Sequence, residues 1–457
     1  MQSLCLLALL TSTPSETATR TLTETATRTL TETATRTLTL AEAVELAIAA
    51  DPEQARAELA HDRADLAALR AELDRFRFKV DAQLQELWTR ANIGGDRADG
   101  MDGGLGLSNL SASLTIPIFA GFRVESGVDR ADRLVEAAQH DALEQRRATA
   151  IAVARAYWAV RKIALLRDVD LQALDRMESA EQIARARRLA GLAPPIDEGR
   201  ARARRLRQEA VVADLDGASR EASARLAVLL GLEQALILVD SPRAPAALSV
   251  TLDAVLEAAH HRRPGLQAAR ARADAQREAV AIAEASYYPT LDAFSLFQYG
   301  NNPSLAGAGS RAVFGTANPF EGMAGDFQIG AVLSINLFDT LSTYTAVKDA
   351  RLEEERLWRE SEQARRGADA EVRTAYARVG RFSQLQARLH AAEAVARDNV
   401  EINKRRYESG EAQVFELLDS EIELLELERQ LADSQAEHTL AWLELDAASG
   451  QLVGGRE

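Results

Sequence analysis

Residues 325–338 carry a clear alternation of apolar and polar positions. On one side of an extended backbone every position is apolar, and the positions between them are polar, small or a single valine. The apolar side consists of Phe327, Ile329, Ala331, Leu333, Ile335 and Leu337. A period of two is typical of a β-strand with one apolar and one polar face. The segment exceeds the average strand of roughly 5–6 residues and fits the roughly 9–11 residues of a tilted strand that crosses a bilayer.

Three other segments show related patterns, so the sequence predicts four strands. Their expected bounds are about 76–89, 109–119, 289–299 and 326–338. The third is less regular, because Phe294 and Leu296 interrupt its alternation. The segments that follow the first and third strands, 91–108 and 300–325, are rich in Gly, Asn and Asp, which is typical of exposed loops.

Two long segments, 123–190 and 342–409, contain no proline and predict helices of unusual length. At a rise of 1.5 Å per residue, some 65 residues span about 100 Å. Each segment ends beside a glycine, Gly191 or Gly410, which suits a helix end followed by a turn.

A returning helix is predicted after each glycine turn, over 196–230 and 412–449. In the second of these, Leu417, Leu424 and Leu431 recur every seven residues. Sevenfold spacing indicates a coiled-coil seam.

The chain repeats its own plan. Residues 39–52 align with residues 251–264, and later landmarks keep an offset of 219. Such a duplication divides the sequence into a first structural repeat (39–235), a linker (236–250), a second repeat (251–453) and a short tail (454–457). The matched landmarks include Ile116 with Ile335, Tyr157 with Tyr376, Gly191 with Gly410, and Gly231 with Gly450.

The N-terminal region precedes both repeats. Residues 1–15 contain a short apolar run without a basic start, and we interpret them as the remnant of an export signal. Cys5 suggests a lipid-attachment site, but the residues before it fit such a site poorly. Residues 16–38 are built from identical ETATRTLT octads, for which we predict a solvated Thr-rich spacer.

Composition agrees with a mainly helical chain. Hydrophobic residues make up 47% of the sequence but aromatic residues only 5%, because alanine and leucine dominate. The net charge of −15 argues against nucleic acid as a partner and suits a passage that prefers cations. The single cysteine excludes an internal disulfide.

Four strands are too few for a closed barrel, which needs about eight. Open strand edges are not tolerated in lipid. Membrane strands in this chain would therefore have to be shared between copies. Two copies would give eight strands and a filled interior, whereas three would give twelve strands and a lumen. We favour three, because an acidic, helix-extended wall suits a water-filled passage.

The sequence resembles the TolC-like family of outer membrane factors over residues 39–453. The resemblance rests on the order and duplication of several motifs, and no single motif decides it. The motifs are TLAEAVELAIAADP (39–52), IPIFAGFR (116–123), INLFDTLS (335–342), AYWAV (156–160), AYARV (375–379) and RRYESGEAQVFELLDSE (405–421).

The resemblance implies an α+β membrane protein with an internal twofold repeat per chain. Three copies would share a 12-stranded β-barrel, continued by a long α-helical barrel. The implied protein is a passive, gated channel-tunnel in the bacterial outer membrane that extends into the periplasm. Its partners would be a periplasmic adaptor protein, an inner-membrane transporter and outer membrane lipid. Drugs, metal ions and secreted proteins all remain open as cargo.

The same resemblance implies a gate beyond the second glycine turn. Family members carry acidic residues six and nine positions after that glycine, which are Glu416 and Asp419 here. The matching positions of the first repeat are Asp197 and Arg200. Three copies of the acidic residues would form a ring that binds cations and narrows the pore. The alternative is that they are ordinary solvated acids on a helix surface.

The two glycine turns would be the tips that meet the adaptor. Gly191 and Gly410 mark these turns, and Pro194 and Pro195 follow the first of them. The two prolines depart from a regular turn, so the sequence leaves the adaptor contact open at this tip.

The sequence does not predict an enzyme. It contains no HExxH, P-loop or nucleophile-elbow motif. His260 and His261 are adjacent on a helix and cannot face one metal, so we expect neither a metal site nor a cofactor. Tyr157, Trp158 and Tyr376 are expected to pack between helices. The competing function is a soluble helical coiled-coil scaffold or adaptor.

Overall fold

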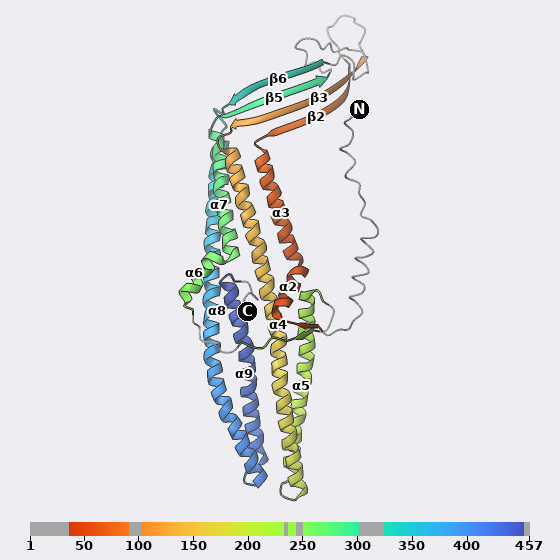
Figure 1. Cartoon of the computed structure of the whole chain (residues 1–457), viewed down its shortest axis with the longest axis vertical. Helices are drawn as coiled ribbons and strands as arrows, with labels where there is room; N and C mark the ends of the chain where they lie inside the picture. Colours follow the sequence, from red (N-terminus) through yellow and green to blue (C-terminus); the bar gives the residue numbers. More distant parts are fainter. Residues whose placement is uncertain (1–35, 91–101, 233–235, 244–249, 301–323, 452–457) are drawn as a thin grey trace.

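The computed structural model describes residues 36–90, 102–232, 236–243, 250–300 and 324–451. They form an elongated molecule with a β-sheet at one end and two helical hairpins at the other (Figure 1). The predictions for residues 1–15 and 454–457, and for most of the spacer, lie outside the described residues. None of the described helices is both long enough and apolar enough to cross a membrane.

The same order of elements occurs in both halves of the chain. The first half contains α2 (Leu40–Ala50), α3 (Pro52–Leu73), β2 (Arg77–Arg90), β3 (Asp102–Phe119), α4 (Arg123–Leu189) and α5 (Pro195–Leu230). The second half contains α6 (Leu252–Arg262), α7 (Pro264–Glu284), β5 (Thr290–Gly300), β6 (Ala324–Ser334), α8 (Ser342–Ser409) and α9 (Val414–Ala448). A single 3₁₀ turn, Ala285–Tyr287, follows α7. Two short strands, β1 (Arg36–Leu38) and β4 (Leu236–Leu238), pair in parallel at mid-height.

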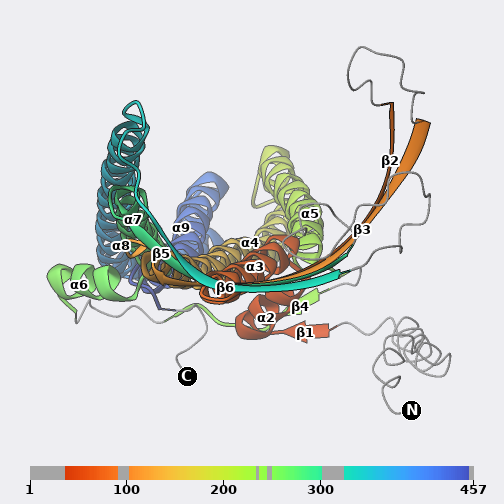
Figure 2. The ribbon, with the colours of Figure 1, turned by 90° about the horizontal axis from the view of Figure 1, so that it is seen from above.

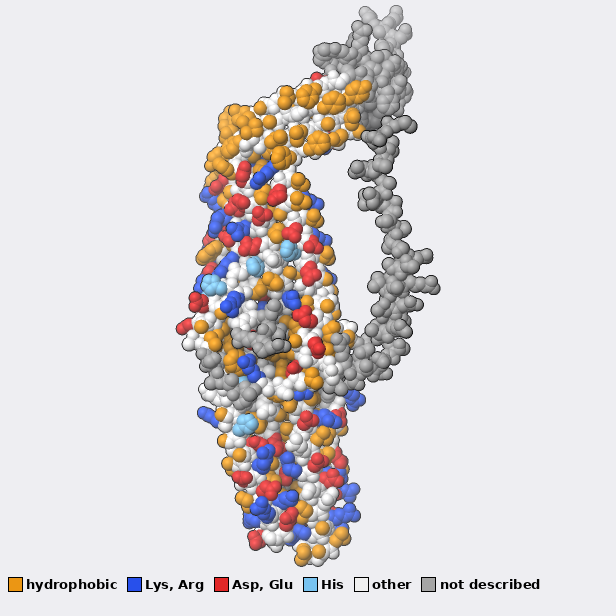
Figure 3. Space-filling model, viewed as in Figure 1, with side chains coloured by type: hydrophobic (Ala, Val, Ile, Leu, Met, Phe, Trp, Pro, Cys, Tyr) orange, Lys and Arg blue, Asp and Glu red, His pale blue; other side chains and the backbone are white. Residues whose placement is uncertain are grey.

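The larger sheet is a single curved antiparallel layer. Its strand order is β2-β3-β5-β6, so β2 and β6 are edge strands without an outer partner among the described residues. The apolar side chains of β6 are exposed: Phe327 by 62%, Ile329 by 79% and Leu333 by 71%. Hydrophobic side chains cover much of the visible sheet face, whereas charged side chains are spread over the helices (Figure 3).

Two strand bounds differ from the sequence prediction. β3 begins at Asp102, so the glycine-rich end of the expected loop 91–108 is strand. Its backbone continues the ladder with β2 as far as the pair Arg90 and Asp102, and this pairing overrides the weak strand preference of glycine. β6 ends at Ser334, although we predicted a strand to residue 338. The partner strand β5 begins at Thr290, opposite Ser334, so the residues beyond have nothing to pair with in this sheet.

The long helices α4 and α8 contain 67 and 68 residues and run from the sheet to the hairpin ends. Both pack against α7 near the sheet and against α9 near the hairpin ends. α3 and α5 pack on α4. Seen from above, α5 and α8 lie at opposite ends of a curved layer of helices (Figure 2).

Tyr157 anchors the start of the folded chain at mid-height. Its side chain is fully buried beside Trp158, which confirms the predicted packing role. Its hydroxyl lies 3.0 Å from the carbonyl oxygen of Leu38 and also contacts the Asp240 carboxylate. That carboxylate accepts a hydrogen bond from Leu40 N at 2.6 Å. Burial, reinforced by Asp240, raises the pKa of the tyrosine.

We expect Tyr157→Phe to lower the free energy of unfolding by about 1–3 kcal/mol, because it removes the hydrogen bonds to the Leu38 carbonyl oxygen and the Asp240 carboxylate and takes away the hydroxyl that accepts from Asp240 N at 3.3 Å. Tyr376→Phe is the matched control. The Tyr376 hydroxyl donates to the Val250 carbonyl oxygen at 3.1 Å in an exposed position, so its loss should cost less. Thermal unfolding followed by circular dichroism measures both. Equal losses would show that the Tyr157 hydroxyl has no special role.

The linker is held on α9 around His438. Arg243 N donates to Thr439 Oγ1 at 2.8 Å, and the Arg243 guanidinium lies 4.4 Å from the centre of the Trp442 ring. Trp442 Nε1 donates to His438 Nε2 at 3.1 Å. His438 is fully buried, and burial together with the positive charge of Arg243 lowers its pKa.

Stability should therefore fall as the pH drops below about 6.5, the ordinary pKa of histidine. In that range the unfolded chain binds a proton that the folded chain accepts only at lower pH. His438→Gln removes this titration and keeps an acceptor for Trp442. The difference between the unfolding temperatures at pH 7.5 and pH 5 should be smaller for the variant. An unchanged difference would contradict the assignment.

Candidate functional site at the hairpin ends

Both hairpins turn at the end of the molecule opposite the sheet (Figure 1). Gly191 has φ 73° and Gly410 has φ 88°, a backbone conformation that favours glycine. In the first turn Leu192 N donates to Arg187 O, and in the second Glu411 N donates to Arg406 O, both at 2.8 Å. The sequence therefore closes the two long helices in the same way.

The two prolines of the first turn begin a regular helix. Pro194 is the extended N-cap residue and Pro195 is the first residue of α5. Proline suits this position because the first N–H groups of a helix have no partner within it. Gly191, Pro194, Pro195 and Gly410 are all exposed. Both hairpin ends are thus accessible in a single chain.

Glu416 lies in the first turn of α9. Its carboxylate accepts a hydrogen bond from Gln413 N at 3.3 Å, completing a capping box, and lies 3.4 Å from Arg406. Asp419 follows three residues later on the same side of the helix and is exposed. Glu416 therefore caps α9 in addition to any role in a pore, whereas Asp419 is an exposed acid on the surface of the helix.

Asp197 lies in the first turn of α5 and is partly exposed. Its negative charge acts on Tyr407 of α8. The pKa of Tyr407 is raised by burial and by Asp197, and Arg187 opposes the shift. No hydrogen bond or ion pair that the structure describes joins Asp197 to Glu416 or Asp419. The structure thus places all three acids at one end of the molecule without bringing them into contact within one chain.

Arg187 joins the two hairpins, and the sequence analysis missed it. Its guanidinium donates to the carbonyl oxygens of Tyr407 and Glu408 at 2.6 and 3.0 Å. It also lies over the Tyr407 ring. A cation at the end of α8 donates to carbonyl groups of the last helical turn and is favoured by the helix dipole. The first hairpin is therefore fastened to the last turn of α8.

Charged side chains also fill the seam between α4 and α9. Arg176 contacts two buried carboxylates, Glu421 at 2.8 Å and Glu428 at 2.7 Å. Burial raises the pKa of Glu421, and the charge of Arg176 opposes the shift. The sequence held a signal for this seam, because these glutamates are seven residues apart beside the predicted leucine seam.

A second buried group lies further along this seam. Asp170 is 1% exposed, and both its carboxylate oxygens are 3.0 Å from Arg429 Nε. Gln208 of α5 donates to the Asp170 carbonyl oxygen at 3.1 Å and also to its carboxylate. Three helices thus meet at one carboxylate, which no sequence pattern singled out.

The described residues contain no group of three or more His, Cys, Asp and Glu side chains that could hold a metal ion. His260 Nε2 lies 2.6 Å from Asp369 Oδ1 on α8, so it pairs with a residue of a neighbouring helix. The candidate site therefore consists of charged residues at the two hairpin ends and along the seam between α4 and α9.

Comparison with known proteins shows which family the chain belongs to. A family model described as outer membrane efflux protein matches residues 53–232 and residues 255–451. The chain belongs to the outer membrane efflux protein family. This confirms the resemblance found in the sequence and places the protein in the outer membrane. It is a family of channel proteins and not of enzymes.

Protein CyaE of Bordetella pertussis is similar to this chain in sequence. It is 31% identical over 282 residues, which cover 59% of this chain and 55% of CyaE. The matched part of the chain thus spans about half the length of that relative.

Solved structures share the fold of this family member. The outer-membrane channel OprN has a TM-score of 0.73 at 23% identity and covers 90% of this chain and 89% of its own. VceC of Vibrio cholerae has a TM-score of 0.73 at 19% identity, and the match covers 90% of this chain and 96% of VceC. The open state of the Neisseria gonorrhoeae channel MtrE has a TM-score of 0.71 at 16% identity, and the match covers 91% of this chain and 89% of MtrE. The fold is that of outer membrane channels.

Proposed function

We propose that the protein is the outer membrane channel-tunnel of a tripartite efflux or secretion system. In this role it is a passive, gated conduit, and an inner-membrane transporter supplies the energy and the substrate. The sheet would lie in the outer membrane and the helices would extend into the periplasm. The observation that carries this proposal is a single-layer sheet with an exposed apolar face and two edges that have no outer partner among the described residues.

The edges of this sheet support an assembly of several copies. In lipid, each unpaired backbone group at an edge costs several kcal/mol, roughly 4–8 for transfer to hydrocarbon. β6 runs antiparallel to β2, so the β6 edge of one copy can pair with the β2 edge of the next in the same sense as the other strands. Three copies would close a homotrimeric barrel of twelve strands.

The hairpin ends would form the gate and the contact with the adaptor. Three copies would place Glu416 and Asp419 around one axis, with Asp197 on the neighbouring hairpins, and would concentrate negative charge at the narrow end of the tunnel. The exposed turns at Gly191, Pro194, Pro195 and Gly410 would meet the periplasmic adaptor. Exposed apolar residues beside the first turn, Leu189 and Leu192, support such a contact.

The soluble helical scaffold is the weaker alternative. It accounts for the long helices but gives no reason for an exposed apolar sheet. Membrane fractionation followed by conductance measurement in a planar bilayer tests the proposal. We expect the protein to require detergent for extraction and to form water-filled channels. Recovery without detergent, or a bilayer that stays closed after insertion, would contradict the proposed channel.

A further inference from the structure

One face of α5 and one face of α8 have no neighbouring helix in the described parts of the chain, although the corresponding faces of α9 and α4 are covered. α9 packs against α4 along the seam described above. The repeat relates α9 to α5 and α4 to α8. The corresponding faces of α5 and α8 lie at opposite ends of the helical layer and cannot meet within one chain (Figure 2).

We infer that the free face of α5 binds the free face of α8 in a second copy, in the register of the α4–α9 seam. This inference rests on the proposed assembly and names the residues that join its copies. It commits to three contacts across the interface: Arg381 with Asp214, Val395 with Leu206, and Asp398 with Arg202. In each pair, the first residue belongs to α8 of one copy and the second to α5 of the next.

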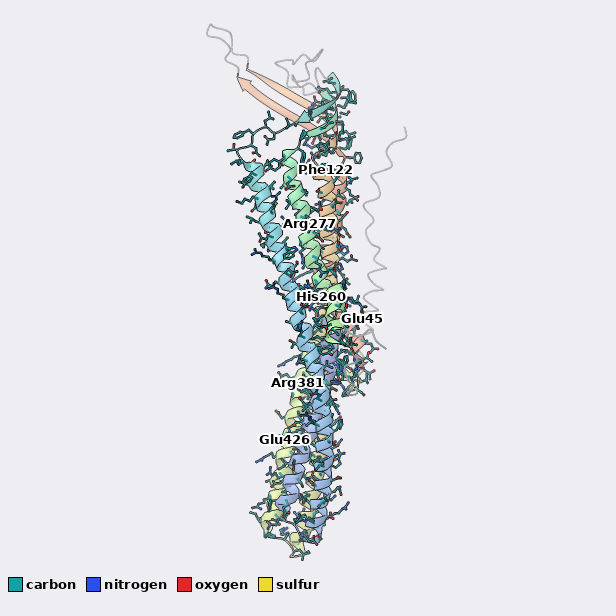
Figure 4. The ribbon with its side chains drawn as sticks, turned by 90° about the vertical axis from the view of Figure 1, so that its left-hand side faces the viewer. Glu45, Phe122, His260, Arg277, Arg381 and Glu426 are labelled. Atoms are coloured by element: carbon teal, nitrogen blue, oxygen red, sulfur yellow. The ribbon has the colours of Figure 1, made fainter. Side chains whose placement is uncertain are left out.

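The seam within the chain supplies the register. Lys162 of α4 pairs with Asp433 of α9. The repeat offset of 219 converts this pair into Arg381 and Asp214, which again have opposite charges. Both residues are exposed and lack an ion pair in the described parts of the chain. Arg381 lies on the half of α8 that leads to the hairpin end (Figure 4).

The apolar contact follows from a second pair of the same seam. Met177 of α4 and Leu425 of α9 belong to one buried cluster. Their counterparts are Ala396 and Leu206. Ala396 is itself buried in a cluster with Leu424 of α9 in its own chain, so the neighbouring Val395 is the residue that α8 exposes at this level. Leu206 is 47% exposed and Val395 is 62% exposed in a single chain. Covering both would remove apolar surface from water.

The third contact shows why the interface is not a plain copy of the seam. Arg176 and Glu421 form an ion pair within the chain, but their counterparts are Val395 and Arg202. The charge on α5 is thus reversed, and the basic partner on α8 is absent. Asp398 lies one turn beyond Val395, is exposed, and has no ion pair that the structure describes. Asp398 therefore provides the negative charge that pairs with Arg202 in the proposed interface.

A disulfide test examines this register directly. Leu206→Cys and Val395→Cys are combined in a Cys5→Ser chain, and the protein is oxidised in mild detergent. The two positions lie at opposite ends of the helical layer of one chain, so a disulfide must join different copies. We expect denaturing gels to show covalently linked trimers that reducing agent converts to monomers.

The matched control combines Leu206→Cys with Leu352→Cys. Leu352 is also exposed on α8, but it lies 43 residues from Val395, about 65 Å along the helix. This control should give no crosslink. Crosslinking of the control, or none with Val395→Cys in a protein that is still trimeric, would overturn the register and leave the channel proposal standing. A monomer in both experiments would overturn both proposals.

Charge reversal provides a second readout. Arg202→Asp places two acids opposite each other and should raise the dissociation rate of the trimer up to roughly fivefold per interface, as expected for an exposed ion pair. Adding Asp398→Arg should restore the original rate. Failure of the second change to restore it would contradict the proposed pair.

Discussion

Replacing Glu416 by Gln and Asp419 by Asn is expected to raise single-channel conductance and to weaken block by multivalent cations. In a trimer the double variant removes six negative charges from the narrow end of the tunnel. Each carboxylate contributes about 1 kcal/mol of attraction to a unit charge at 4 Å in water. The apparent affinity for a trivalent cation should therefore fall at least about tenfold. Planar bilayer recording with a trivalent cation on the helical side measures both quantities.

The choice of substitutions separates charge from structure. Glu416→Gln keeps an oxygen that can accept the hydrogen bond from Gln413 N, whereas alanine would also remove the capping box. The control is Asp62→Asn with Glu72→Gln on α3, which removes the same charge from exposed positions nearer the sheet. Unchanged conductance and block, or the same change in the control, would exclude the acidic ring.

Removing Arg429 should strongly destabilise the helical region. Asp170 would keep Gln208 as a partner but lose its counter-ion in a fully buried position. Leaving one charge of a buried pair costs about 3–5 kcal/mol. Arg429 is 36% exposed, so we expect Arg429→Ala to lower the free energy of unfolding by roughly 3 kcal/mol, at the lower end of that range. Thermal unfolding of the helical signal measures the loss.

Two controls test the mechanism of that loss. Arg225→Ala removes an arginine that is 76% exposed and pairs with Glu221, four residues before it. Its loss should be within about 0.5 kcal/mol. The double variant Asp170→Leu with Arg429→Met replaces both charges by apolar groups and should recover most of the stability. A loss with Arg429→Ala no larger than with Arg225→Ala would show that the buried pair contributes little.

Periodicity and glycine placement predicted the long elements of this fold from the sequence. The absence of proline over 123–190 and 342–409 and the glycines that follow defined α4, α8 and their turns. The motifs around Tyr157, Gly410 and their counterparts pointed to the family. These features depend on residues that are close together in the sequence, so they could be predicted without knowing the distant contacts of the folded chain.

Features set by distant partners could not be predicted in this way. The ends of β3 and β6 depend on which residues lie opposite in β2 and β5. Composition pointed to a loop at the start of β3, and apolar alternation pointed to a longer strand at the end of β6. Arg187 looks like any exposed basic residue until the end of α8 is placed beside it. The pairing of Asp170 with Arg429 spans 259 residues and leaves no periodic signal.

The number of copies in the purified protein tests the central claim most directly. Native mass spectrometry after extraction in mild detergent should show one species of three 49.7 kDa chains, less any segment removed during export. A channel built from shared strands requires this closed assembly. A folded monomer with its full helical and sheet signals would contradict the account.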